Sequence, residues 1–82
     1  MASREDLIRA IDLALSGRWE DAHKLVQTHA SDRRACHIHA ILHLQEGDES
    51  NAGYWFRRSG AERPLHLEPE TQLARLREEL CG

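Results

Sequence analysis

The sequence of 82 residues is poor in several informative residue types. It has two cysteines, too few for a disulfide framework, so we expect free thiols in a reducing cytoplasm. Its apolar runs are short, so we expect neither a membrane span nor a signal peptide. Lysine occurs once and the net charge is −3, which argues against nonspecific binding to nucleic acid or anionic membranes.

Residues that favour β-strands are also scarce. No stretch alternates between apolar and polar residues as a half-buried strand does. Apolar residues recur instead at helical spacing, which predicts an all-α fold and a single domain over residues 1–82. The β-branched residues are Ile8, Ile11, Val26, Thr28, Ile38, Ile41 and Thr71.

Five helices are expected, with a loop over residues 61–68 where Pro64 cannot continue a helix. Their approximate bounds are 4–15, 19–29, 33–46, 50–59 and 69–80. Capping residues, glycines that accept a left-handed turn, and a proline suited to a first helical turn mark these bounds. These signals are Ser3, Gly17, Ser31 or Asp32, Gly47, Asp48 or Ser50, Gly60 and Pro69.

An internal repeat appears when the chain is shifted by 30 positions. A period between 20 and 50 residues is typical of stacked helical repeats. We therefore divide the domain into two helical hairpins, residues 4–30 and 33–60, and a terminal helix of about residues 69–81. The matching pairs are Ile8 with Ile38, Ala10 with Ala40, Ile11 with Ile41, Gly17 with Gly47, Ala22 with Ala52, and Val26 with Phe56.

This pattern of Ala, Gly, then Ala followed by a large apolar residue resembles the tetratricopeptide repeat. Residues 48–59 resemble more closely the second helix of Sel1-like repeats. The resemblance implies antiparallel helix pairs in a right-handed α–α superhelix, and a module that binds proteins or peptides. The first unit, residues 8–30, matches less well, since its second helix lacks an aromatic pair.

The chain is also similar to a small uncharacterised bacterial family, and that similarity implies no activity. The family signature is His-Ala-x-Leu-His-x-x-Glu-Gly-Asp-x-x-Asn-Ala-x-Tyr-Trp-aromatic. The matching residues are His39, Ala40, Leu42, His43, Glu46, Gly47, Asp48, Asn51, Ala52, Tyr54, Trp55 and Phe56.

Histidine is abundant, with six residues, and the helix over 33–46 arranges two of them for chelation. His39 and His43 lie one turn apart on one helical face and form a pair able to bind zinc, nickel or copper. Cys36 and Glu46 share that stripe, and His23 could join from the preceding helix. His37 is expected to face solvent.

A structural interpretation competes with metal binding. His43 and Glu46 border the turn that contains Asp48 and Asn51, and they could simply hold that turn by polar contacts. From the sequence alone we favour this interpretation, because no Cys-x-x-Cys or His-Glu-x-x-His pattern supports a metal site. A nucleophile–base pair of Cys36 and His39 is weaker still, since one small helix surface offers no oxyanion hole.

The consecutive aromatic residues Tyr54, Trp55 and Phe56 cannot all face inward from one helix. We expect Phe56 in the core, Trp55 against a neighbouring helix and Tyr54 partly exposed. With the nearby arginines, the outward residues suggest a surface for a peptide carboxylate or phosphate. The candidate binding residues are Tyr54, Trp55, Arg57, Arg58, Asp48 and Asn51.

The leading functional hypothesis is therefore a non-enzymatic adaptor without a cofactor, which binds a protein or peptide. The alternative is a small metal-binding protein centred on His39 and His43. For the terminal helix we expect packing on the fourth helix, helped by Leu65 and Leu67, or presentation of its leucine stripe to a second copy in a homodimer.

Overall fold

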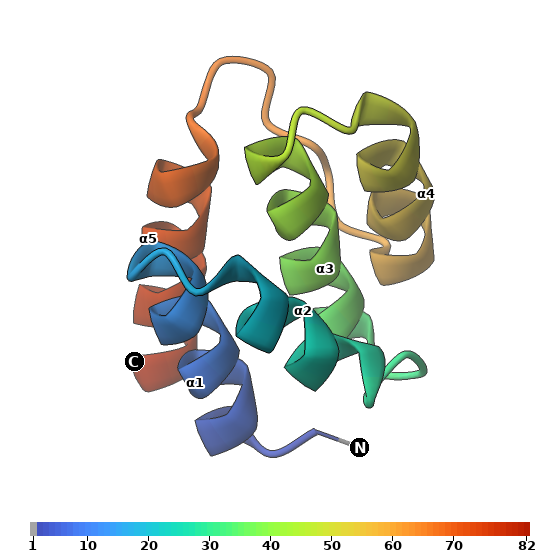
Figure 1. Ribbon diagram of the computed structural model, residues 1–82. Coiled ribbons are helices and arrows are strands. Elements are labelled where there is room, and N and C mark those ends of the chain that lie inside the picture. The colour runs from blue at the N-terminus through green and yellow to red at the C-terminus, as the bar shows by residue number, and fades with distance from the viewer. Residues whose placement is uncertain (1) are drawn as a thin grey trace.

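The computed structural model describes residues 2–82 and contains five α-helices in this range, with no strand (Figure 1). This confirms the all-α prediction. The helices are α1 (Arg4–Leu15), α2 (Trp19–Gln27), α3 (Arg33–Gln45), α4 (Glu49–Ser59) and α5 (Pro69–Cys81). None of these helices is both long and apolar enough to cross a membrane.

Helix starts follow the local sequence signals. The side chains of Ser3, Asp32 and Asp48 each accept a hydrogen bond from a backbone N–H in the first turn of α1, α3 and α4. Gly17 and Gly47 adopt left-handed backbone angles, with φ of 85° and 79°, in the turns between paired helices. The alternatives Ser31 and Ser50 are therefore not the caps.

The largest error in the predicted bounds concerns α2, which ends at Gln27 instead of His29. The turn that follows is stabilised locally, since the Thr28 hydroxyl donates to the Leu25 carbonyl at 2.7 Å. The other ends differ from prediction by one residue at most.

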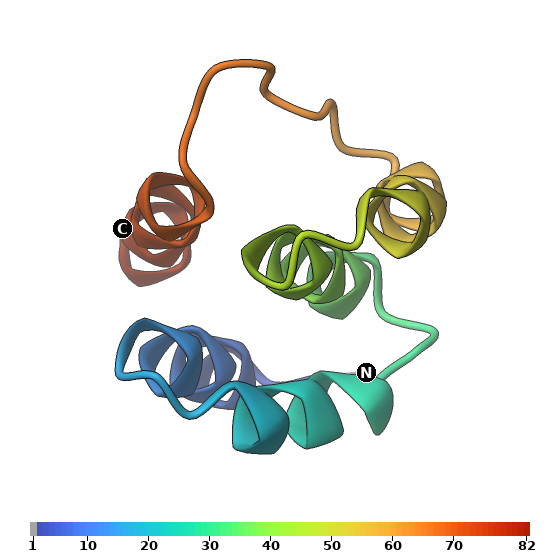
Figure 2. The ribbon, with the colours of Figure 1, turned by 45° about the horizontal axis from the view of Figure 1, so that its top comes forward.

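Helix α3 occupies the centre of the molecule, and it contacts every other helix (Figure 2). Its buried residues are therefore spread around its circumference, and this explains why its sequence does not show one clean apolar stripe. They are Ala35, Cys36, Ile38, His39, Ala40, Ile41, Leu42 and His43.

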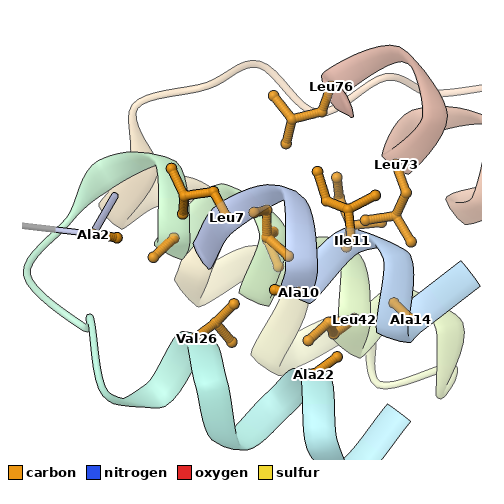
Figure 3. Packing of buried hydrophobic residues seen from close by; sticks show 14 of the residues in the cluster. Ala2, Leu7, Ala10, Ile11, Ala14, Ala22, Val26, Leu42, Leu73 and Leu76 are labelled. Carbon is orange, nitrogen blue, oxygen red and sulfur yellow. The ribbon is translucent and has the colours of Figure 1, made fainter. Parts of the chain in front are cut away.

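Alanines at repeat-related positions allow the helices to approach closely. Ala10, Ala22, Ala40 and Ala52 are all 0% exposed. Figure 3 shows Ala10 and Ala14 of α1 facing Ala22 and Val26 of α2. The buried pattern thus recurs in the two predicted units, whereas the assignment to a particular repeat family stays a prediction.

The position of α5 differs from the prediction. It packs against α1 and α3, and it makes no contact with α4 within the described part of the chain. Loop 60–68 carries the chain from the end of α4 back past α3 (Figure 1). Leu73 and Leu76 then meet Leu7 and Ile11 of α1 (Figure 3).

The leucine stripe of α5 is consequently buried within the chain and is not free to meet a second copy. Leu73, Leu76 and Leu80 are each less than a tenth exposed. Arg77 adds an ion pair to Asp12 of α1, with Nε 2.6 Å from Oδ1. Leu65, predicted to support the docking, is 83% exposed.

Candidate histidine cluster

Three histidines from two helices meet where α2 packs on α3. One ring nitrogen of each of His23, His39 and His43 lies within 4.8 Å of the others. The closest pair is Nε2 of His23 and Nε2 of His39, 3.0 Å apart. The structure therefore brings together three of the five residues predicted as metal ligands.

The helices place these rings for simple geometric reasons. His39 and His43 are one turn apart on α3, so their side chains project from the same face. Their rings lie 5.0 Å apart and nearly parallel. Trp19 holds α2 in register, because its indole N–H donates to the Leu42 carbonyl at 2.7 Å and so aligns His23 with the α3 pair.

Two tryptophans enclose the cluster. Trp55 of α4 stacks on His39 with ring centroids 3.9 Å apart, and Trp19 stacks on His23 at 4.5 Å. The two indole rings exclude water from the imidazoles and restrict the rotation of the imidazole rings. Neither tryptophan was predicted from the sequence to belong to the histidine site, although Trp19 precedes His23 by one helical turn.

Burial keeps His39 neutral. Desolvation, followed by the neighbouring His23 and His43, lowers the pKa of His39 from 6.5 to about 3. Burial and His43 also lower the pKa of His23, against an opposing effect of Glu46. Neutral imidazole is the form that coordinates metals, so His39 carries no positive charge that would oppose binding near neutral pH.

His39 has an unsatisfied nitrogen. Its Nδ1 is buried and has no hydrogen-bond partner within residues 2–82. In the metal-free chain the ring proton is best placed on Nε2, where it can be donated to His23, since a buried N–H without an acceptor is costly. Coordination of a metal through Nε2 requires this proton to move to Nδ1, for which no acceptor lies within residues 2–82.

Among residues 2–82, the carboxylates of Glu46 and Asp48 lie next to His43. Nδ1 of His43 lies 3.1 Å from Glu46 Oε1 and 4.0 Å from Asp48 Oδ2. These three residues form a second group of potential ligands that shares His43 with the first. Glu46 was predicted to lie near the histidine pair, and the structure places its carboxylate next to Nδ1 of His43.

Cys36 does not join the histidines. Its thiol contacts the Ala30 carbonyl in the loop between α2 and α3, with a sulfur–oxygen distance of 3.2 Å. It is absent from the potential ligand groups found among residues 2–82. The predicted stripe was wrong at this end, because the preceding loop folds over the first turn of α3 and occupies the thiol.

His37 does not face solvent as predicted. It is partly buried, with its ring centroid 5.8 Å from that of Phe56, and burial lowers its pKa. The cause is the central position of α3, which leaves little of its surface uncovered.

The six predicted binding residues separate into two groups. Tyr54, Trp55 and Arg58 form one, where the Arg58 guanidinium lies 5.8 Å from the Tyr54 ring centre and 5.5 Å from that of Trp55. Arg57 is exposed beside them. Asp48 and Asn51 belong to the start of α4, where Asn51 Nδ2 donates to Asp48 Oδ2 at 2.6 Å.

Within the first group, Arg58 also donates to the Ala30 carbonyl and the Tyr54 hydroxyl, each at 3.4 Å. Its guanidinium is thus partly engaged by the protein itself. Tyr54 is 45% exposed, Trp55 is partly buried and Phe56 is buried, as the helical geometry predicted.

No protein-family model, curated protein or solved structure matches this chain.

Proposed function

We propose that this protein binds a transition-metal ion through His23, His39 and His43. The main supporting observation is that three imidazole nitrogens, one from α2 and two from α3, lie within 4.8 Å of one another. Nitrogens that share a tetrahedral zinc ion at the usual bond length lie about 3.4 Å apart. The 3.0 Å separation of His23 and His39 is close to that value, and the ligand nitrogen of His43 lies within 4.8 Å of both.

The donor set defines the class of metal. Imidazole suits Zn²⁺, Cu²⁺ and Ni²⁺, whereas Mg²⁺ and Ca²⁺ require oxygen ligands. Since Cys36 lies outside the group, the site lacks the thiolate that favours Cu⁺ or an iron–sulfur cluster. We expect affinities in the order Cu²⁺ above Ni²⁺ and Zn²⁺, with no measurable binding of Mg²⁺.

Calorimetric titration and thermal unfolding test this proposal. At a free Zn²⁺ concentration of 100 times Kd, binding should raise the free energy of unfolding by about 2.7 kcal/mol, because the ion binds only the folded site. The gain should disappear with EDTA. His23→Gln should lose most of the binding, and His66→Gln, a change in the exposed loop, should bind like the wild type.

The proposal fails if the wild type shows neither binding heat nor a shift in melting with any of the three ions. It also fails if His66→Gln weakens binding as strongly as His23→Gln does. His23 is only partly buried, so this variant is expected to remain folded.

A second candidate is the adaptor function, with the two helix pairs acting as a tetratricopeptide- or Sel1-like module for a protein or peptide. It is supported by the exposed Tyr54 with Arg58 lying over its ring. We rank it second, because Arg58 already donates to the Ala30 carbonyl. A pull-down that gives the same partners for wild type, Tyr54→Ala and Arg57→Glu would eliminate it.

A further inference from the structure

The turn after α3 lies next to Nδ1 of His43. Gly47 has a left-handed backbone, and the N–H of Asp48 donates to the His43 carbonyl at 2.9 Å. This turn holds Glu46 and Asp48 beside Nδ1 of His43. Glu46 Oε1 lies 3.1 Å from His43 Nδ1, within hydrogen-bonding distance.

That contact fixes the tautomer of His43. An ionised carboxylate only accepts hydrogen bonds, so the ring nitrogen beside it must carry the proton. A neutral imidazole has one N–H, and placing it on Nδ1 leaves the lone pair on Nε2. His43 therefore presents Nε2 as its available donor for a metal.

Asp48 is less suited to this role, because it is already used as the cap of α4. It accepts from the backbone N–H of Asn51 at 3.2 Å and from the Asn51 side chain at 2.6 Å, and these bonds lower the pKa of Asp48. Its distance to His43 Nδ1 is 4.0 Å. Glu46 is thus the carboxylate that orients His43.

Resting on the proposed function, we infer that Glu46 is a positioning residue of the metal site and that the fourth coordination position stays open. The three histidines form one ligand group among residues 2–82, and neither carboxylate belongs to it. Zinc sites with three protein ligands complete their shell with water or another exogenous ligand. The ligand class for this position is water, a small anion such as azide, or a free imidazole.

Replacing Glu46 tests the positioning role. Glu46→Ala should weaken Zn²⁺ binding 10- to 100-fold, as is usual for loss of a partner behind a ligating histidine, and Glu46→Gln should fall between it and the wild type. The matched control is Glu78→Gln on α5, which removes the same charge from another exposed position and should leave binding unchanged. The Glu46 side chain is 43% exposed, so both variants should fold.

Two spectroscopic measurements distinguish a Glu46 that orients the His43 ring from a Glu46 that only stabilises the fold. Nitrogen NMR should show His43 protonated on Nδ1 in the wild type and a mixture of tautomers in Glu46→Ala. In Co²⁺-substituted wild type, azide should alter the visible spectrum, because it enters the open position.

The inference is overturned if Glu46→Ala binds as tightly as the wild type, if His43 is protonated on Nε2, or if azide leaves the Co²⁺ spectrum unchanged. A stoichiometry of two ions would also overturn it, because Glu46 and Asp48 would then act as ligands to a second metal through His43. The binding, azide and stoichiometry results require a wild type that binds metal, whereas the tautomer of His43 is measured without metal. A wild type that binds none refutes the proposed function itself.

Discussion

Phe56→Ala is expected to lower the free energy of unfolding by about 3–5 kcal/mol, because it deletes a large aromatic side chain from a packed interface. Phe56 is 4% exposed. Its helix, α4, contacts α3 and no other helix in residues 2–82, so few other interactions can replace those of Phe56. Such a loss is a large fraction of the total stability of a small domain. Urea unfolding followed by circular dichroism measures it.

Tyr54→Ala is the matched control for Phe56→Ala on the same helix. Tyr54 is 45% exposed, so its loss should cost less than about 1 kcal/mol. Equal effects of the two variants would contradict the described orientation of α4. Hydrogen exchange should also show that α4 amides lose protection first in Phe56→Ala.

Acid should destabilise the metal-free protein at a pH well above the range where carboxylates titrate. The pKa of His39 is about 3 in the folded chain against 6.5 in the unfolded one. Between these values the unfolded state binds a proton that the folded state excludes, so stability falls as pH decreases from above 6.5. For His39 alone the loss between pH 8 and pH 5 is about 2 kcal/mol.

His23 and His37 contribute in the same direction, because their pKa values are also lowered. His39→Leu isolates the role of His39, since leucine keeps an apolar contact with Trp55 and cannot be protonated. Urea unfolding with EDTA, measured from pH 8 to pH 5, should give a slope at pH 5 that is smaller by about one proton in this variant. An unchanged slope would show that His39 is not the buried neutral group described.

The helix boundaries were predictable because local chemistry fixes them. Ser3 caps α1, Asp48 caps α4, and Gly17 and Gly47 adopt the left-handed angles that their turns require. These signals depend on neighbours in sequence. The buried alanines were also predictable, since the 30-residue repeat marks positions where helices cross.

The docking of α5 was not predictable from such signals. The leucine stripe of α5 fits any apolar groove. Loop 60–68 is long enough for α5 to reach more than one such groove. The choice of α1 and α3 over α4 depends on their shape and on the pairing of Arg77 with Asp12, which lie far apart in sequence.

The candidate site has one part that local sequence predicts and another that depends on contacts between distant residues. The spacing of His39 and His43 predicts their shared face, because both lie on one helix. The arrival of His23 depends on the crossing of α2 and α3, and the stacking of Trp55 on His39 depends on the placement of α4. The loop before α3 takes up the Cys36 thiol and so separates it from the cluster, and that separation could not be predicted from helical spacing alone.

X-ray absorption spectroscopy of the Zn²⁺-loaded protein at neutral pH tests the central claim most directly, because it identifies the atoms bound to the ion. We predict three imidazole ligands, one additional oxygen or nitrogen atom and no sulfur. A sulfur neighbour would implicate Cys36 or Cys81, neither of which belongs to the proposed ligand group. Fewer than three imidazoles would contradict a site built from His23, His39 and His43.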